Sequence, residues 1–124
     1  MNNKYNNCNY NIIRSNGTEL IQSDKLPQDE VFHGFSTRNG GVSREPYASL
    51  NLGLSRDEPK ENILRNFRIL CDAFGLDFEK LVIVNHEHGS NVIRVDSSHY
   101  GRGLYREPLP FCDGLITDLS LIHI

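Results

Sequence analysis

Short apolar runs, separated by polar turn residues, make up most of the chain. Asn16-Gly17 stands between one apolar run at 10–14 and another at 18–22. Both turn residues tolerate positive φ, so this pattern predicts a tight β-hairpin. Further apolar runs predict short strands at 31–36, 81–84 and 92–95, with another beginning at Gly114.

One stretch has helical periodicity. Ile63, Phe67, Leu70 and Phe74 follow one another at steps of 4, 3 and 4 residues, which places them on one face of a helix over 60–74. Gly75 is a typical helix end, because it has no Cβ to oppose the left-handed conformation. Several strands with one main helix predict an α+β (mixed α/β) fold.

Two segments lack regular periodicity. Six asparagines occupy the first 11 residues, and we expect residues 1–11 to be a disordered start. Residues 37–54 contain three glycines and a proline with few apolar residues between them, which predicts a long loop. Long loops inside compact domains are usually functional or disordered.

Composition narrows the class of protein. The 124 residues suffice for one domain, and 13 basic against 16 acidic residues give a net charge of −3. This balance argues against nucleic-acid and anionic-membrane partners. No run approaches the ~20 apolar residues that span a bilayer, and the start has no signal-peptide core. Cys8, Cys71 and Cys112 form no CxxC pair, so a cytoplasmic location is expected.

The pair His86-x-His88 follows the run at 81–84. In an extended chain, residues two apart face the same way, so both imidazoles could reach one metal ion. The simpler interpretation is two polar histidines in a hairpin loop, because an isolated pair needs further ligands.

The long loop holds two other candidates. Arg38 precedes Gly40-Gly41 and can bind a phosphate or carboxylate, but a tight turn is the favoured interpretation of these glycines. Asn51 lies between two leucines, and its amide either is held by backbone hydrogen bonds or faces a ligand. Cys112 is more typical of a small buried residue than of a nucleophile.

Several motifs occur in the order seen in one known family. From Val31 to Thr117 the chain resembles the peptidoglycan editing factor family, also called laccase-domain or multicopper polyphenol oxidoreductase proteins. The segments that carry the resemblance are Phe35-Ser36-Thr37-Arg38-x-Gly40-Gly41-Val42-Ser43, Pro46-Tyr47-x-Ser49-Leu50-Asn51-Leu52-Gly53, Asn66-Phe67-Arg68-x-Leu70, His88-Gly89-Ser90-Asn91-Val92 and Asp113-Gly114-Leu115-Ile116-Thr117.

The resemblance implies a layered laccase-domain (cysteine-hydrolase-like) fold and a catalytic zinc held by two histidines and one cysteine. His88 matches the first histidine, whereas the family's Ala-Asp-Cys and His-x-Gly-Trp-Arg-Gly motifs are missing from this chain, which has no Trp. Arg38 and Asn51 match polar positions around the family's substrate. His86 stands where the family has Gln, and is not expected to be a ligand.

The implied function is that of a zinc-dependent purine nucleoside phosphorylase or adenosine deaminase linked to peptidoglycan editing. The implied small-molecule substrates are adenosine, inosine, methylthioadenosine and phosphate. The alternatives are a copper-dependent polyphenol oxidase and a non-enzymatic binding domain.

The end of the chain departs from the family. Leu119 to Ile124 resembles the translation of a transposon adapter, so residues 12–118 are expected to form the N-terminal part of one domain. Such a fragment is predicted to be inactive by itself.

Overall fold

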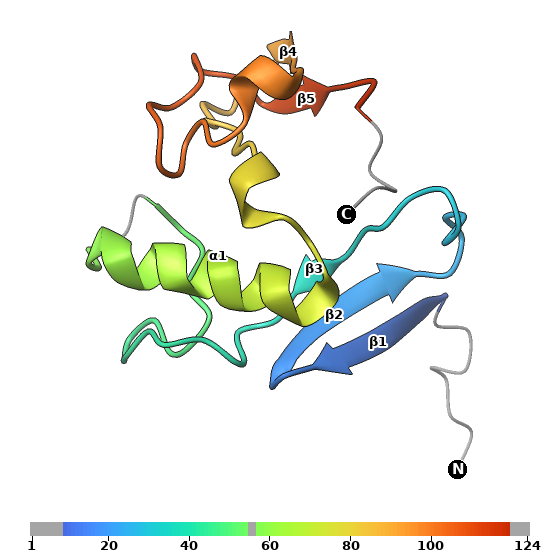
Figure 1. The fold of residues 1–124 in the computed structure, drawn as a ribbon, viewed down its shortest axis with the longest axis vertical. Coiled ribbons are helices and arrows are strands. Elements are labelled where there is room, and N and C mark those ends of the chain that lie inside the picture. Colours follow the sequence, from blue (N-terminus) through green and yellow to red (C-terminus); the bar gives the residue numbers. More distant parts are fainter. Residues whose placement is uncertain (1–8, 55–56, 120–124) are drawn as a thin grey trace. The chain divides into compact units, whose positions relative to one another are not determined.

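The structure is a computed structural model that describes residues 9–54 and 57–119 (Figure 1). It divides into two compact units, Met1–Phe74 and Gly75–Ile124. Helix and sheet both occur, which confirms the mixed fold class. Among the described residues, no helix has the length and apolar character needed to cross a membrane.

The predicted hairpin is confirmed. Strand β1 (Tyr10–Ser15) pairs antiparallel with β2 (Thr18–Ser23) across a two-residue turn. Asn16 and Gly17 have φ of 49° and 81°, the left-handed values that Asn-Gly tolerates. β1 begins at Tyr10, so two residues of the expected irregular start belong to a strand, and residues 1–8 lie outside the described part.

The third strand is shorter than predicted. β3 (Phe35–Ser36) pairs antiparallel with β2, whereas the sequence predicted a strand over 31–36. His33 explains the difference, because its imidazole Nε2 accepts a hydrogen bond from the Ser23 amide at 3.0 Å. The Gln22 side chain in turn donates to the His33 carbonyl at 2.9 Å. Side chains therefore replace the backbone ladder there.

The predicted helix is also confirmed, as α1 (Lys60–Phe74). Ile63 and Phe67 of the predicted face are buried, and Gly75 follows the helix with φ of 68°. A polar residue, Asn66, is also fully buried on this side of α1. The helix therefore buries a hydrogen-bonding group as well as apolar side chains.

In the second unit, the prediction of a strand at 81–84 is wrong. This segment follows a short 3₁₀ helix, η1 (Phe78–Lys80). Its backbone bonds to a loop, with the Gly101 amide donating to the Leu81 carbonyl at 2.7 Å and the Ile83 amide to the Arg102 carbonyl at 3.0 Å. A loop partner supplies isolated hydrogen bonds rather than a ladder.

The sheet of this unit has two parallel strands, β4 (Val92–Arg94) and β5 (Gly114–Ile116). Both were predicted as strands from their apolar runs. Cys112 is fully buried just before β5, which confirms its interpretation as a small core residue. The core contains Val95, Leu109 and Cys112, against which Val82, Val84, Ile93 and Leu115 pack.

Candidate functional site

The loop before α1 is held to the helix by Asn66. Its Oδ1 accepts a hydrogen bond from the Val42 amide at 2.8 Å. Its Nδ2 donates to the Ser43 hydroxyl and to the Asn51 carbonyl, each at 2.8 Å. One buried side chain thus fixes two parts of the loop that are far apart along it, and Figure 1 shows the loop returning along α1.

Arg38 is fixed by the same loop but remains exposed. Its Nε and Nη2 donate to the Ala48 carbonyl at 3.1 and 3.0 Å. The Arg38 carbonyl accepts the amides of Ser49 and Leu50 at 2.9 and 2.8 Å. These bonds use two of the five guanidinium donors, so the oriented side chain can also bind an anion.

The glycines after Arg38 allow close packing. Gly40 has φ of 100°, and a Cβ there would lie 2.6 Å from the Gly17 carbonyl oxygen. A Cβ on Gly41 would lie 2.6 Å from Asn66 Oδ1. Both glycine amides donate to the Ser49 hydroxyl, at 3.1 and 3.2 Å. Since these amides already have a partner, the geometry supports a tight turn rather than a phosphate cradle.

Asn51 is held in place by neighbouring groups. Its Nδ2 donates to the Glu58 carboxylate at 2.6 Å, and its Oδ1 accepts the Gly53 amide at 3.0 Å. A hydrogen bond from the Ser43 hydroxyl, against the opposing effect of partial burial, lowers the pKa of Glu58, with help from Asn51 and Asn62. One backbone amide and one carboxylate therefore hold Asn51, which meets the interpretation of backbone hydrogen bonding only in part, and one N–H of its amide remains for a ligand.

His88 lies in the second unit, in an exposed turn just before β4. It has φ of 62°, and its amide donates to Asp113 Oδ1 at 2.8 Å. Asp113 also accepts the amides of Glu87 at 3.2 Å and Gly89 at 2.7 Å. Partial burial opposes the charge of Asp113, but the hydrogen bonds from Gly89, His88 and Glu87 outweigh it and lower its pKa.

The structure does not support the spacing argument for a two-histidine metal site. That argument needs an extended chain, but residues 85–88 form no strand and His88 is left-handed. Within residues 9–54 and 57–119, no three or more His, Cys, Asp or Glu side chains lie where they could hold a metal ion. The described residues therefore do not fit a complete zinc site.

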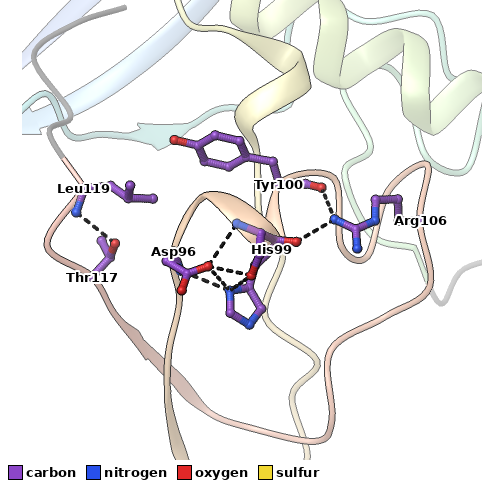
Figure 2. A network of polar contacts seen from close by, with 7 residues as sticks. Asp96, His99, Tyr100, Arg106, Thr117 and Leu119 are labelled. Carbon is purple, nitrogen blue, oxygen red and sulfur yellow. Dashed lines mark hydrogen bonds and ion pairs between the residues drawn. The ribbon is translucent and has the colours of Figure 1, made fainter.

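Sequence reasoning missed the groups that position these loops, and also the role of His99. Figure 2 shows His99 beside Asp96 at η2 (Ser97–His99), where its Nδ1 accepts the Asp96 amide at 3.0 Å. Asp96 in turn accepts the Ser98 amide at 2.9 Å. This reciprocal cap has a sequence signal, an Asp followed by a polar residue three positions later. Arg106 donates to the carbonyls of Ser98 and Tyr100, each at 2.8 Å, and so holds the same turn from a later loop.

Comparison with known proteins supports the family resemblance. The family model of multi-copper polyphenol oxidoreductase laccase matches residues 32–124. The purine nucleoside phosphorylase YlmD of Bacillus subtilis (strain 168) is 34% identical over 91 residues, which are 72% of this chain and 33% of the relative. The purine nucleoside phosphorylase LACC1 of Mus musculus is 39% identical over 79 residues, which are 61% of this chain and 18% of the relative.

Solved structures show the same fold. The crystal structure of YlmD from Geobacillus stearothermophilus matches with a TM-score of 0.79 at 27% identity, covering 90% of this chain and 41% of that one. The Bacillus licheniformis hypothetical protein YfiH matches with a TM-score of 0.77 at 25% identity. The chain spans about a third of the length of its bacterial relative YlmD. With its fold and its motifs in agreement, the chain belongs to the multi-copper polyphenol oxidoreductase laccase family.

Proposed function

We propose that the whole protein to which this chain belongs is a purine nucleoside phosphorylase. In this reaction the bond between the purine nitrogen and ribose C1′ breaks, a phosphate oxygen bonds to C1′, and the released base takes up a proton. The relatives named purine nucleoside phosphorylase support the reaction class. Adenosine, inosine and methylthioadenosine are the proposed nucleosides. The family resemblance further implies adenosine deamination and a link to peptidoglycan editing, and the cysteine content implies a cytoplasmic location.

The geometry of Arg38 carries the proposal. The Ala48 carbonyl orients its guanidinium through two hydrogen bonds, yet the side chain is exposed. Planar guanidinium groups bind phosphate through paired hydrogen bonds. Arg38 is therefore assigned to phosphate binding, and the amide of Asn51 to a polar group of the nucleoside.

The proposed cofactor is zinc, with His88 as one of its ligands. The described residues contain no group of three or more side chains that could hold a metal ion, so further ligands must come from other parts of the protein. Copper is the alternative that the family's name suggests. Metal analysis of the purified whole protein distinguishes the two.

Arg38→Ala in the whole protein tests phosphate binding. Because a hydrogen bond to a charged group contributes about 1.5–3 kcal/mol, we expect the phosphate KM to rise about 10- to 100-fold. The assay is phosphate-dependent release of purine base from adenosine. Arg44→Ala, an exposed arginine of the same loop, is the matched control. An unchanged phosphate KM in the Arg38 variant would rule out this role.

His88→Ala tests the metal assignment. We expect it to abolish both bound zinc and turnover, because a catalytic zinc typically has three protein ligands and loses affinity when one is removed. His86→Ala removes the neighbouring exposed histidine and should keep both. Full zinc content and wild-type turnover in the His88 variant would contradict the assignment. The isolated 124-residue chain is predicted to be inactive in the same assay.

A further inference from the structure

We propose that Asp113 is the positioning residue of His88. The inference rests on the proposed function only in taking His88 as a functional residue. The Asp113 carboxylate binds the backbone of the turn that carries His88. It therefore fixes the position of the His88 backbone, from which the imidazole projects, without touching a ligand itself. Three observations in the second unit support this role.

The first observation is the convergence of three consecutive amides on one carboxylate. Asp113 Oδ1 accepts the amides of Glu87 and His88, at 3.2 and 2.8 Å, and Oδ2 accepts the Gly89 amide at 2.7 Å. Successive backbone N–H groups that include a left-handed residue form a concave anion site. Here a side chain from a point 25 residues further along the chain fills that site.

The second observation is that residues 112–113 hold both ends of the same segment. The Cys112 amide donates to the Asn85 carbonyl at 2.9 Å, before the turn. The Asp113 amide donates to the Asn91 carbonyl at 2.8 Å, after the turn. The turn is therefore fixed at its start, middle and end by two adjacent residues, of which Cys112 is fully buried.

The third observation is the conformation of His88 itself. A φ of 62° is unfavourable for a residue with a Cβ, so surrounding contacts must maintain it. The Asp113 bonds on either side supply such contacts. Gly89 suits this close approach, since a Cβ there would lie 3.3 Å from Asp113 Oδ2, a tight but not forbidden contact. Without these bonds, the His88 backbone would relax toward common φ values and the imidazole would change direction.

Asp113 directly precedes β5, so its loss could also destabilise that strand. The test must therefore separate a general loss of stability from a change in the position of His88. Asp113→Asn keeps the size of the side chain but replaces one acceptor oxygen with an N–H donor that faces an amide. Asp118→Asn is the matched control, because Asp118 follows the same strand and pairs with Arg94 at 2.9 Å on the surface. Both variants lose a carboxylate of the second unit, and only the first changes the turn.

The experiment is NMR on the whole protein with labelled histidine. In Asp113→Asn we expect amide exchange at His88 and Gly89 to quicken about tenfold or more, and the His88 ring resonances to shift. Asp118→Asn should leave both unchanged. Where the wild type binds Zn²⁺, Asp113→Asn should lower that affinity about 10- to 100-fold, as is usual for groups that orient ligands.

The outcomes are distinct. Wild-type exchange at His88 and Gly89 in Asp113→Asn would overturn the proposal. Faster exchange with His88 ring resonances like those of Asp118→Asn would also overturn it, because Asp113 would then hold the backbone without directing the imidazole. A wild-type protein without phosphorolysis would refute the proposed function alone, since the exchange and the ring resonances do not depend on turnover.

Discussion

Asn66 is uncharged, yet its side chain holds the conformation of the loop that carries Arg38. It binds the Val42 amide, the Ser43 hydroxyl and the Asn51 carbonyl from a fully buried position. Each of these groups would lose a partner if the amide were removed. The consequence for stability is larger than that of any one hydrogen bond, because buried polar groups left without partners cost more than the bond contributes.

Asn66→Ala should therefore lower the free energy of unfolding by about 2–4 kcal/mol. Urea unfolding of the whole protein measures the change. Arg65→Ala, at the adjacent exposed position of α1, is the control and should change stability by less than about 0.5 kcal/mol. Equal midpoints for the two variants would show that the amide network does not stabilise the loop.

Glu58 gives the same loop a pH dependence. The hydrogen bond from Ser43 lowers its pKa below the ordinary value of 4.5 despite partial burial, and Asn51 adds to the effect. A carboxylate with a lowered folded-state pKa contributes stability above its unfolded pKa, and loses that contribution as the pH falls through the folded value. The wild type should thus be more stable than Glu58→Gln near neutral pH, and this difference in the free energy of unfolding should shrink as the pH falls below 4.5.

Urea unfolding from about pH 7 to about pH 3 measures this advantage. Glu45→Gln, at an exposed carboxylate of the same loop, serves as the comparison. If the stability difference between the Glu58 and Glu45 variants stayed constant over that range, Glu58 would not be the group responsible.

Part of this residue-scale description was accessible from the sequence. Motif matching singled out Arg38, Asn51 and His88, but not the side chains that hold their segments from a distance. Asn66 binds the Val42 amide 24 residues away, and Asp113 binds the His88 amide 25 residues away. Apolar periodicity contains no information about such contacts. One signal was present, because Asn66 lies three residues after Ile63 and so on the face predicted to be buried.

At the scale of elements, local patterns predicted what local interactions determine. The Asn-Gly hairpin and α1 were predicted because turn chemistry and helical periodicity act over a few residues. The run at 81–84 has equally strong β character but forms no strand, because its neighbour at 101–102 is a loop. Pairing partners are a property of the fold and not of the run itself.

Gly40 lies where the long loop over residues 37–54 packs against the turn between β1 and β2. Gly40→Ala should lower the free energy of unfolding by about 3 kcal/mol or more, because the new methyl group combines left-handed strain with a clash against the Gly17 carbonyl. Gly17→Ala is the matched control. It also has positive φ but meets nothing within 4 Å, so it should cost only about 1–2 kcal/mol. Thermal unfolding compares them, and equal losses would exclude the close contact.

At the scale of the whole molecule, the chain spans about a third of its bacterial relative YlmD. Parallel sheets are normally covered on both faces. In the β4–β5 sheet, Ile93 and Leu115 pack on the core, whereas Val92 and Ile116 alternate to the other face and are 64% and 60% exposed.

We expect the isolated chain to self-associate through this exposed face of the β4–β5 sheet. Val92→Thr with Ile116→Thr should reduce the associated fraction in sedimentation velocity. Leu26→Thr, an exposed apolar position outside the sheet, should not. Equal association of the two variants would place the contact elsewhere.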